Sequence, residues 1–185
     1  MTVHEAMHAY VGLKLGDTTA AEEGRISLNP LHHIDPFASV ILPIATFILL
    51  CSPILAAKPV PFNPHRVRYG EYGAALIAAA GPLSNLAMAI LGSLLLHAGV
   101  GGVLATIIFL FIQLNVALFV FNLVPIPPLD GSRVLYALAP EPLQDVMRQI
   151  EPYGFFIIIA LVFVTGFGGV LVNLNQLVLH LLLGV

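Results

Sequence analysis

Three long runs without a charged residue restrict what this chain can fold into. Residues 36–57, 72–129 and 152–185 contain no Asp, Glu, Lys or Arg, so the runs are 22, 58 and 34 residues long. Only 9% of the 185 residues are charged, whereas an ordinary soluble domain has about 25%. Because about 20 apolar residues in a helix cross the hydrocarbon core of a bilayer, the pattern predicts a polytopic membrane protein.

The apolar runs divide into several expected helices. We predict an opening helix over 1–15 and two spans over 74–98 and 102–123, joined by an uncharged turn. The apolar tail is interrupted by glycines at 166–169, which predicts one span and a shorter helix, or two short helices. A strand-like stretch lies at 24–28 in the first polar loop.

The basic residues indicate how the chain is oriented. Lys and Arg collect in three polar loops, whereas the turn between 74–98 and 102–123 contains none. If the basic loops are cytoplasmic, these two spans form a hairpin and the first two basic loops lie on the same side. The segment 37–57 between those loops, interrupted by Pro43 and Pro53, would then be re-entrant. A true crossing is the alternative.

The first ten residues, MTVHEAMHAY, place two histidines and a carboxylate in little more than one helical turn. His4 and His8 are four residues apart, so both side chains share one face of a helix and can bind one metal ion. Glu5 is turned toward a metal-bound water rather than the metal. This is the His-Glu-x-x-His pattern of zinc hydrolases. The alternative is a pair of interfacial histidines at a helix end.

Asp130 is the candidate third ligand, because catalytic zinc takes three protein ligands and leaves a fourth position open. It is the only charged residue between Glu71 and Arg133, and it lies in NLVPIPPLDGSRV. We expect the prolines to present the carboxylate from non-helical backbone and Gly131 to allow a tight turn after it. The alternative is that Asp130 caps the next helix.

Together these motifs resemble the site-2 protease family of intramembrane zinc metalloproteases, the M50 peptidases. Besides HEAMH and NLVPIPPLDG, the stretches LNPLHHIDP, KPVPFNP, GPLSNL and EPYG are similar to short bacterial and archaeal members that have no PDZ or CBS domain. The resemblance covers nearly the whole chain. It implies one Zn²⁺ per chain, bound by His4, His8 and Asp130, with Glu5 as the general base.

The resemblance also implies an activity and a location. We expect an intramembrane zinc metalloendopeptidase that hydrolyses peptide bonds in or near transmembrane segments of substrate proteins, as in regulated intramembrane proteolysis. We expect a multi-pass protein of a prokaryotic cell membrane with its active site toward the cytoplasm. Family members have a hydrophobic helix before the zinc helix. We therefore expect residues 1–185 to be one membrane-embedded metalloprotease domain that lacks this helix.

Two asparagines and one extended segment are further candidates for roles at the site. In the family, the asparagine that corresponds to Asn122 is implicated in substrate handling, and an interhelical hydrogen bond is the alternative. Asn85 is a weaker candidate, because Gly81, Pro82 and Ser84 resemble a point of close helix packing. The segment KPVPFNP (58–64) is expected to be extended and to offer an edge with which an unwound substrate pairs.

The predicted fold class is an all-α polytopic bundle of about four to six transmembrane or re-entrant helices, with short extended or hairpin segments near the active site. Its partners are the lipid bilayer and a transmembrane protein substrate, and the small, dispersed net charge of -3 predicts no nucleic-acid partner. Two other functions fit parts of the pattern. They are a catalytically silent protein of the same fold that binds transmembrane partners, and a zinc transporter.

Overall fold

The computed structural model describes residues 1–33, 60–61, 63, 66–164 and 166–184, and all regular elements in these ranges are helices. In chain order they are α1 (Thr2–Lys14), α2 (Thr19–Glu22), the 3₁₀ helix η1 (Pro30–His33), α4 (Gly70–His97), α5 (Gly102–Asn122), α6 (Asp130–Leu138), α7 (Glu141–Ile150), the 3₁₀ helix η3 (Glu151–Tyr153), α8 (Gly154–Val164) and α9 (Phe167–Leu183). The predicted all-helical class is confirmed for this part of the chain.

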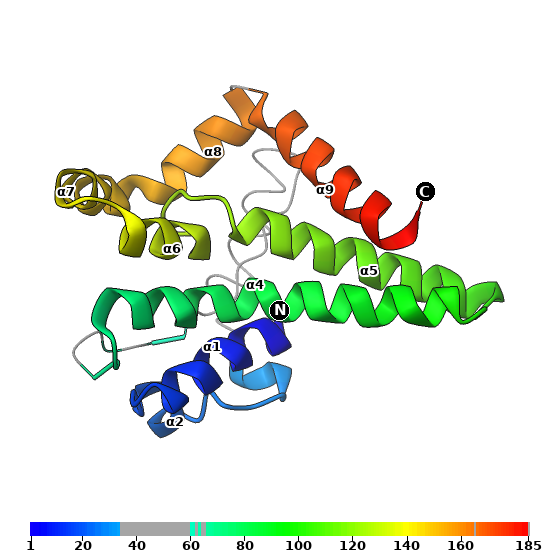
Figure 1. Ribbon diagram of the computed structural model, residues 1–185, viewed down its shortest axis with the longest axis horizontal. Helices are drawn as coiled ribbons and strands as arrows, with labels where there is room; N and C mark the ends of the chain where they lie inside the picture. The colour runs from blue at the N-terminus through cyan, green and yellow to red at the C-terminus, as the bar shows by residue number, and fades with distance from the viewer. Residues whose placement is uncertain (34–59, 62, 64–65, 165, 185) are drawn as a thin grey trace.

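Helix α4 is the central element of the molecule. Figure 1 shows α1 on one side of α4 and α6 on the other, while α5 runs back along α4 after a short turn. Helix α9 crosses over α5, and α8 connects it to the shorter helices α6 and α7. Helix α1 from the start of the chain and α6 from near residue 130 therefore both pack against α4.

Among the described helices, α4 and α5 are long and apolar enough to cross a membrane, judged by length and composition. They coincide with the spans predicted at 74–98 and 102–123. Apolar side chains cover the outer face of α5, where Ile107, Leu110 and Leu114 are each more than half exposed. A helix that is apolar on its exposed face is typical of contact with lipid. The predicted total of four to six helices in the membrane remains a prediction.

The α4–α5 hairpin is held together by close packing of small and branched side chains. Ala89 of α4 lies against Ile112 and Val116 of α5, and all three are fully buried. A Cβ added at Gly92 would lie 2.8 Å from Cγ1 of Ile112. The glycine therefore lets the two helices approach more closely than a larger residue would allow.

The strand-like stretch predicted at 24–28 is not a strand. Gly24 has a positive φ of 68°, and its N–H donates to Ala21 while the N–H of Arg25 donates to the carbonyl of Ala20. These two bonds form the Schellman motif that closes a helix. The segment thus ends α2, because its backbone donors are used there instead of in a sheet.

Two predicted segments lie wholly or largely outside the described residues. The first is the re-entrant segment at 37–57. The second is the extended stretch 58–64, of which residues 60, 61 and 63 are described and have no regular secondary structure. Its expected pairing with substrate stays a prediction.

Candidate metal centre

Helix α1 places the first two candidate ligands side by side. His4 and His8 are both 7% exposed, and their Nε2 atoms lie 3.1 Å apart. The two rings meet edge to face, with centroids 4.6 Å apart. The i, i+4 spacing of the sequence therefore produces the shared face that was predicted for it.

Asp130 reaches the same point from the far side of α4. Its Oδ2 lies 3.2 Å from Nε2 of His4 and 3.4 Å from Nε2 of His8. These three residues are the group of potential metal ligands found among the described residues. The two histidines are buried, and the N-cap position of α6 is Leu129 instead of Asp130.

Two details of the Asp130 prediction were wrong. The carboxylate is presented by the first residue of α6 instead of by non-helical backbone, and the prolines lie just before it. Gly131 continues the helix and makes no tight turn. A Cβ at Gly131 would lie 2.2 Å from the carbonyl oxygen of Leu123, so glycine is needed there because the start of α6 lies against the end of α5.

The geometry of the three side chains fits a zinc ion. With metal–ligand distances of about 2.0–2.1 Å, two ligands of a tetrahedral zinc lie roughly 3.3 Å apart, and the three observed separations are 3.1, 3.2 and 3.4 Å. Oδ2 of Asp130 is also buried and accepts no hydrogen bond from the described residues. A buried carboxylate oxygen that faces two ring nitrogens requires a cation or a proton between them.

Helix α4 supports the two imidazoles from behind. Nδ1 of His8 donates a hydrogen bond of 2.7 Å to the carbonyl oxygen of Ile77. This bond places the proton of the neutral ring on Nδ1 and leaves the lone pair of Nε2 directed at the centre. Nδ1 of His4 lies 3.2 Å from Nδ2 of Asn85, which is fully buried. Both rings are thus held through the nitrogen that faces away from Asp130.

Gly81 of α4 leaves the space that the imidazoles occupy. A Cβ at this position would lie 2.3 Å from Nε2 of His8 and 2.7 Å from Cε1 of His4. The close packing predicted for Gly81 is therefore present, and its partner is the metal centre itself. Glu5, the predicted general base, follows His4 in α1 and is buried, with 9% exposure. Its catalytic role stays a prediction.

The backbone around Asp130 is held by close contacts with neighbouring elements. Oγ of Ser132 donates to the carbonyl oxygen of Leu129 at 2.7 Å. Gly154 at the start of α8 fits under the loop, because a Cβ there would lie 2.2 Å from the carbonyl oxygen of Pro127. This contact gives the glycine of the EPYG stretch a structural reason. The loop is fixed by backbone contacts that only glycine permits.

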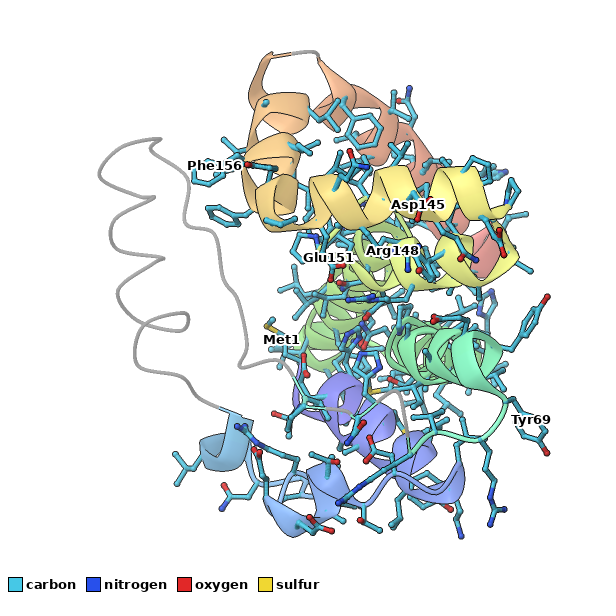
Figure 2. All side chains as sticks on the ribbon, turned by 90° about the vertical axis from the view of Figure 1, so that its left-hand side faces the viewer. Met1, Tyr69, Asp145, Arg148, Glu151 and Phe156 are labelled. Atoms are coloured by element: carbon cyan, nitrogen blue, oxygen red, sulfur yellow. The ribbon has the colours of Figure 1, made fainter. Side chains whose placement is uncertain are left out.

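Charged residues lie on the outside of this region. Arg133 of α6 pairs with Glu151 of η3, and Arg148 pairs with Asp145 within α7. Figure 2 shows Asp145, Arg148 and Glu151 grouped around α7 and η3. These pairs are at least one-third exposed, and pairs of this kind contribute about 0–1 kcal/mol. These ion pairs lie on the exposed polar face, whereas the contacts of Gly131 and Gly154 position Asp130.

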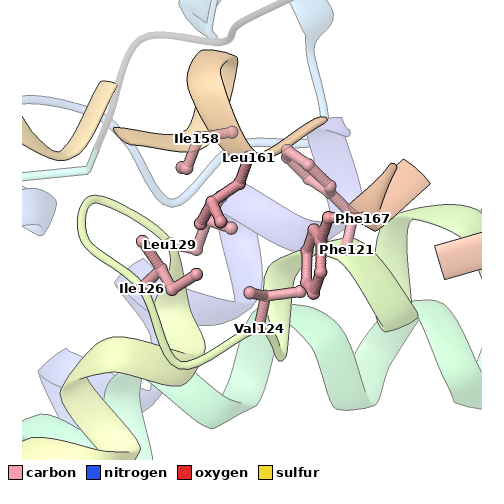
Figure 3. A pocket seen from close by; sticks show the side chains of 7 residues that line it. All are labelled: Phe121, Val124, Ile126, Leu129, Ile158, Leu161 and Phe167. Atoms are coloured by element: carbon pink, nitrogen blue, oxygen red, sulfur yellow. The ribbon is translucent and has the colours of Figure 1, made fainter. Parts of the chain in front are cut away.

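An apolar pocket lies beside the loop that carries Asp130 (Figure 3). It is formed by the end of α5, by the residues just before α6, by α8 and by the start of α9. Its lining side chains are Phe121, Val124, Ile126, Leu129, Ile158, Leu161 and Phe167. Leu129 links this pocket to the metal centre, because the next residue is the ligand Asp130.

The first polar loop is tied to the chain segment that precedes α4. Asp17 is 2% exposed, and its Oδ2 accepts a hydrogen bond of 2.7 Å from the N–H of Asn63. The N–H of Arg68 donates to the carbonyl oxygen of Leu15 at 2.8 Å. Burial alone would raise the pKa of Asp17, but hydrogen bonds from Thr19 and Asn63 outweigh it and lower the pKa.

The structure gives the two asparagines different hydrogen-bond partners. Nδ2 of Asn122 donates to the carbonyl oxygen of Leu118 in its own helix, so the expected interhelical bond is replaced by a local one. Its substrate-binding role stays a prediction. Asn85, in contrast, contacts a candidate ligand. Its signal in the sequence was a polar amide four residues after Gly81 in an apolar span, on the same helical face.

Known proteins that resemble this chain are peptidases of family M50 or are described as candidate zinc metalloproteases. The profile of peptidase family M50 matches residues 97–165. YwhC of Bacillus subtilis (strain 168), described as a candidate zinc metalloprotease, is 40% identical over 177 residues, which are 90% of this chain and 77% of that protein. No solved structure matches the chain.

Two mycobacterial proteins named Rip2, also described as candidate zinc metalloproteases, are more distant. The protein of Mycolicibacterium smegmatis is 30% identical over 87% of this chain and 62% of its own length. That of Mycobacterium tuberculosis (strain H37Rv) is 32% identical over 87% of this chain and 61% of its own length. The chain therefore spans less than two thirds of either Rip2 protein.

Proposed function

The chain belongs to peptidase family M50, the site-2 protease family, and we propose that it is an intramembrane zinc endopeptidase that cleaves transmembrane segments of other proteins. The observation that carries the proposal is the convergence of His4, His8 and Asp130 at distances that suit zinc. The two apolar helices α4 and α5 support a membrane location.

In this proposal His4 and His8 would hold one zinc ion through Nε2, and Asp130 would hold it through a carboxylate oxygen. When bound, zinc lowers the pKa of a water molecule to near 7 and polarises the carbonyl group of the substrate. Three protein ligands leave a fourth position open, as a catalytic site requires. The apolar surroundings strengthen the electrostatic contribution of these groups, because they exclude water.

Glu5 acts as the general base. It accepts a proton from the attacking water as the new C–O bond forms, and it donates that proton to the leaving amine as the C–N bond breaks. Its position directly after His4, in the buried part of α1, supports this role. A silent relative that only binds partners would have no chemical need for a buried carboxylate next to the ligands.

The substrate is a transmembrane segment that unwinds before cleavage, because helical carbonyl groups are already hydrogen-bonded. A zinc transporter would need several sets of ligands along a path through the membrane. Among the described residues, His4, His8 and Asp130 form the one group that could hold a metal ion. A single group favours the protease over a transporter.

We propose that the centre faces the cytoplasm and the turn 98–101 lies on the opposite side, and the distribution of basic residues supports this orientation. Single cysteines test this in a Cys51→Ala background. A membrane-impermeant thiol reagent should reach Gly101→Cys from outside intact cells and Gln149→Cys only after the membrane is opened. Labelling of both from the outside would contradict the orientation.

The proposed activity is tested with Glu5→Gln in proteoliposomes that contain a reporter with a transmembrane segment. We expect zinc to be retained and the cleavage rate to fall by about 10²–10⁴-fold, as for loss of a general base. Glu71→Gln is the matched control, because Glu71 is an exposed carboxylate at the start of α4 and should have no effect. Equal rates for Glu5→Gln and wild type would exclude the proposed mechanism.

A further inference from the structure

We propose that Asn85 is a positioning residue of the metal centre, and that it accepts the Nδ1 proton of His4 when zinc is bound. This inference rests on the proposed function, since it assigns a task to Asn85 at the same zinc site. It concerns Nδ1 of His4, which faces the side chain of Asn85, whereas Nδ1 of His8 donates to the carbonyl of Ile77.

The orientation of the His4 ring determines which of its two nitrogens carries the proton. Its Nε2 is the atom that faces Nε2 of His8 and Oδ2 of Asp130, at 3.1 and 3.2 Å. A neutral imidazole that binds a metal through Nε2 carries its single proton on Nδ1. Histidine ligands almost always donate this second N–H to a fixed acceptor, which sets the ring orientation and raises the basicity of the ligating nitrogen.

The side chain of Asn85 provides the acceptor for the Nδ1 proton of His4. The amide of Asn85 lies 3.2 Å from Nδ1 of His4, with Nδ2 as the nearer atom. Its Oδ1 is buried and has no hydrogen-bond partner among the described residues. The two ends of an amide have nearly the same shape. Rotation of this amide by half a turn therefore places the unpartnered oxygen against the Nδ1 proton without new steric demands.

Helix α4 holds the side chain of Asn85 firmly against His4. Asn85 is fully buried in α4, one helical turn after Gly81, which contacts both imidazoles. Asn85 and Ile77 thus hold the two rings from the same helix, eight residues apart. An aspartate at position 85 has the same size and only acceptor atoms, so it can satisfy a proton on Nδ1 but cannot donate to it.

The test is zinc affinity, measured by competition with a chromogenic chelator in detergent solution. We expect Asn85→Leu to weaken zinc binding by about 10–100-fold, the usual cost of losing such a partner, and Asn85→Asp to bind zinc at least as tightly as wild type. Asn115→Leu is the matched control. Asn115 is also buried in a predicted span, but its amide donates to the carbonyl of Phe111 in its own helix.

Several outcomes separate the inference from its alternatives. Wild-type affinity in Asn85→Leu, or equal weakening in Asn85→Asp and Asn85→Leu, would overturn it. A lower melting temperature of the zinc-free protein with unchanged zinc affinity would assign Asn85 a role in packing only, and would overturn it as well. If Asn85→Leu does not fold, Asn85→Ala replaces it with the same expected weakening. Absence of zinc from wild type would instead refute the proposed function.

Discussion

Gly81 lies in close contact with both imidazoles of the candidate metal centre. Its missing side chain lets α1 lie close enough to α4 for both imidazoles to reach Asp130, since a Cβ would come within 2.3–2.7 Å of their ring atoms. Gly92, further along the same helix, has a similar contact with Ile112 of α5 and none with the centre. The two glycines therefore separate the requirements of metal binding from those of helix packing.

Gly81→Ala should displace the histidines and weaken zinc binding by about tenfold or more, as when the support of a metal ligand is lost. Gly92→Ala is the control and should lower the free energy of unfolding by about 1–3 kcal/mol, the cost of overpacking a core, while zinc affinity stays unchanged. Chelator competition and thermal melting of both variants measure these effects. Equal zinc affinities in Gly81→Ala and wild type would contradict the account.

Single residues also show how far the sequence could be interpreted. The face shared by His4 and His8 follows from helix geometry alone, so the spacing predicted it. The importance of Asn85 could not be predicted in this way, because it depends on how α1 packs against α4. The sequence predicted a tight turn at Gly131, but the structure shows a close contact with the carbonyl of Leu123. Glycine is common at both kinds of position, so the residue type alone could not distinguish a turn from a close contact.

At the scale of elements, the loop before α6 depends on α8. Gly154, the first residue of α8, lies against the carbonyl of Pro127, and Gly131 lies against that of Leu123. These contacts connect the third candidate ligand to the end of α5, which closely precedes it in the sequence, and to α8. The sequence pattern predicted a ligand near the prolines but could not show which helix holds the loop in place.

Gly154→Ala should move the Asp130 loop and reduce the zinc content of the purified protein. Its expected cost in stability is about 1–3 kcal/mol, because the added methyl group would contact backbone that has little freedom to shift. Gly169→Ala in α9 is the matched control, since a Cβ there meets no atom of the described residues within 4 Å. It should leave zinc content unchanged. A Gly154→Ala protein with full zinc content would show that α8 does not position the loop.

The first polar loop provides a prediction about pH. The folded pKa of Asp17 lies below its ordinary value of 3.8, so the carboxylate stabilises the folded protein fully above that value. The stabilisation is lost as the pH falls through the folded pKa. Asp17→Asn should lower the free energy of unfolding by about 1–2 kcal/mol at neutral pH, because it removes a charged hydrogen-bond acceptor.

The melting temperatures of wild type and Asp17→Asn should therefore differ by a constant amount from pH 7 to about pH 4 and converge below it. Asp145→Asn serves as the control, because Asp145 is exposed and pairs with Arg148 of the same helix. The melting temperature of this variant should follow that of wild type throughout. Parallel curves for wild type and Asp17→Asn down to pH 3 would refute the assigned role of the Asp17–Asn63 bond.

At the scale of the whole molecule, the fold brings the start of the chain and a loop near residue 130 to opposite sides of one apolar helix (Figure 1). The charge-free runs predicted helices at α4 and α5 because membrane length and composition set their limits. The same runs could not predict that α1 and α6 meet across α4. That arrangement depends on tertiary packing, to which hydrophobic pattern alone is insensitive.

The central claim is that His4, His8 and Asp130 form one zinc site. Its most direct test is the zinc content of the purified chain, determined by mass spectrometry for wild type, Asp130→Ala and the control Asp145→Ala. We expect close to one zinc per chain in wild type and in Asp145→Ala, and a large loss in Asp130→Ala. A folded wild-type protein without zinc, or an Asp130→Ala protein that retains it, would contradict the claim.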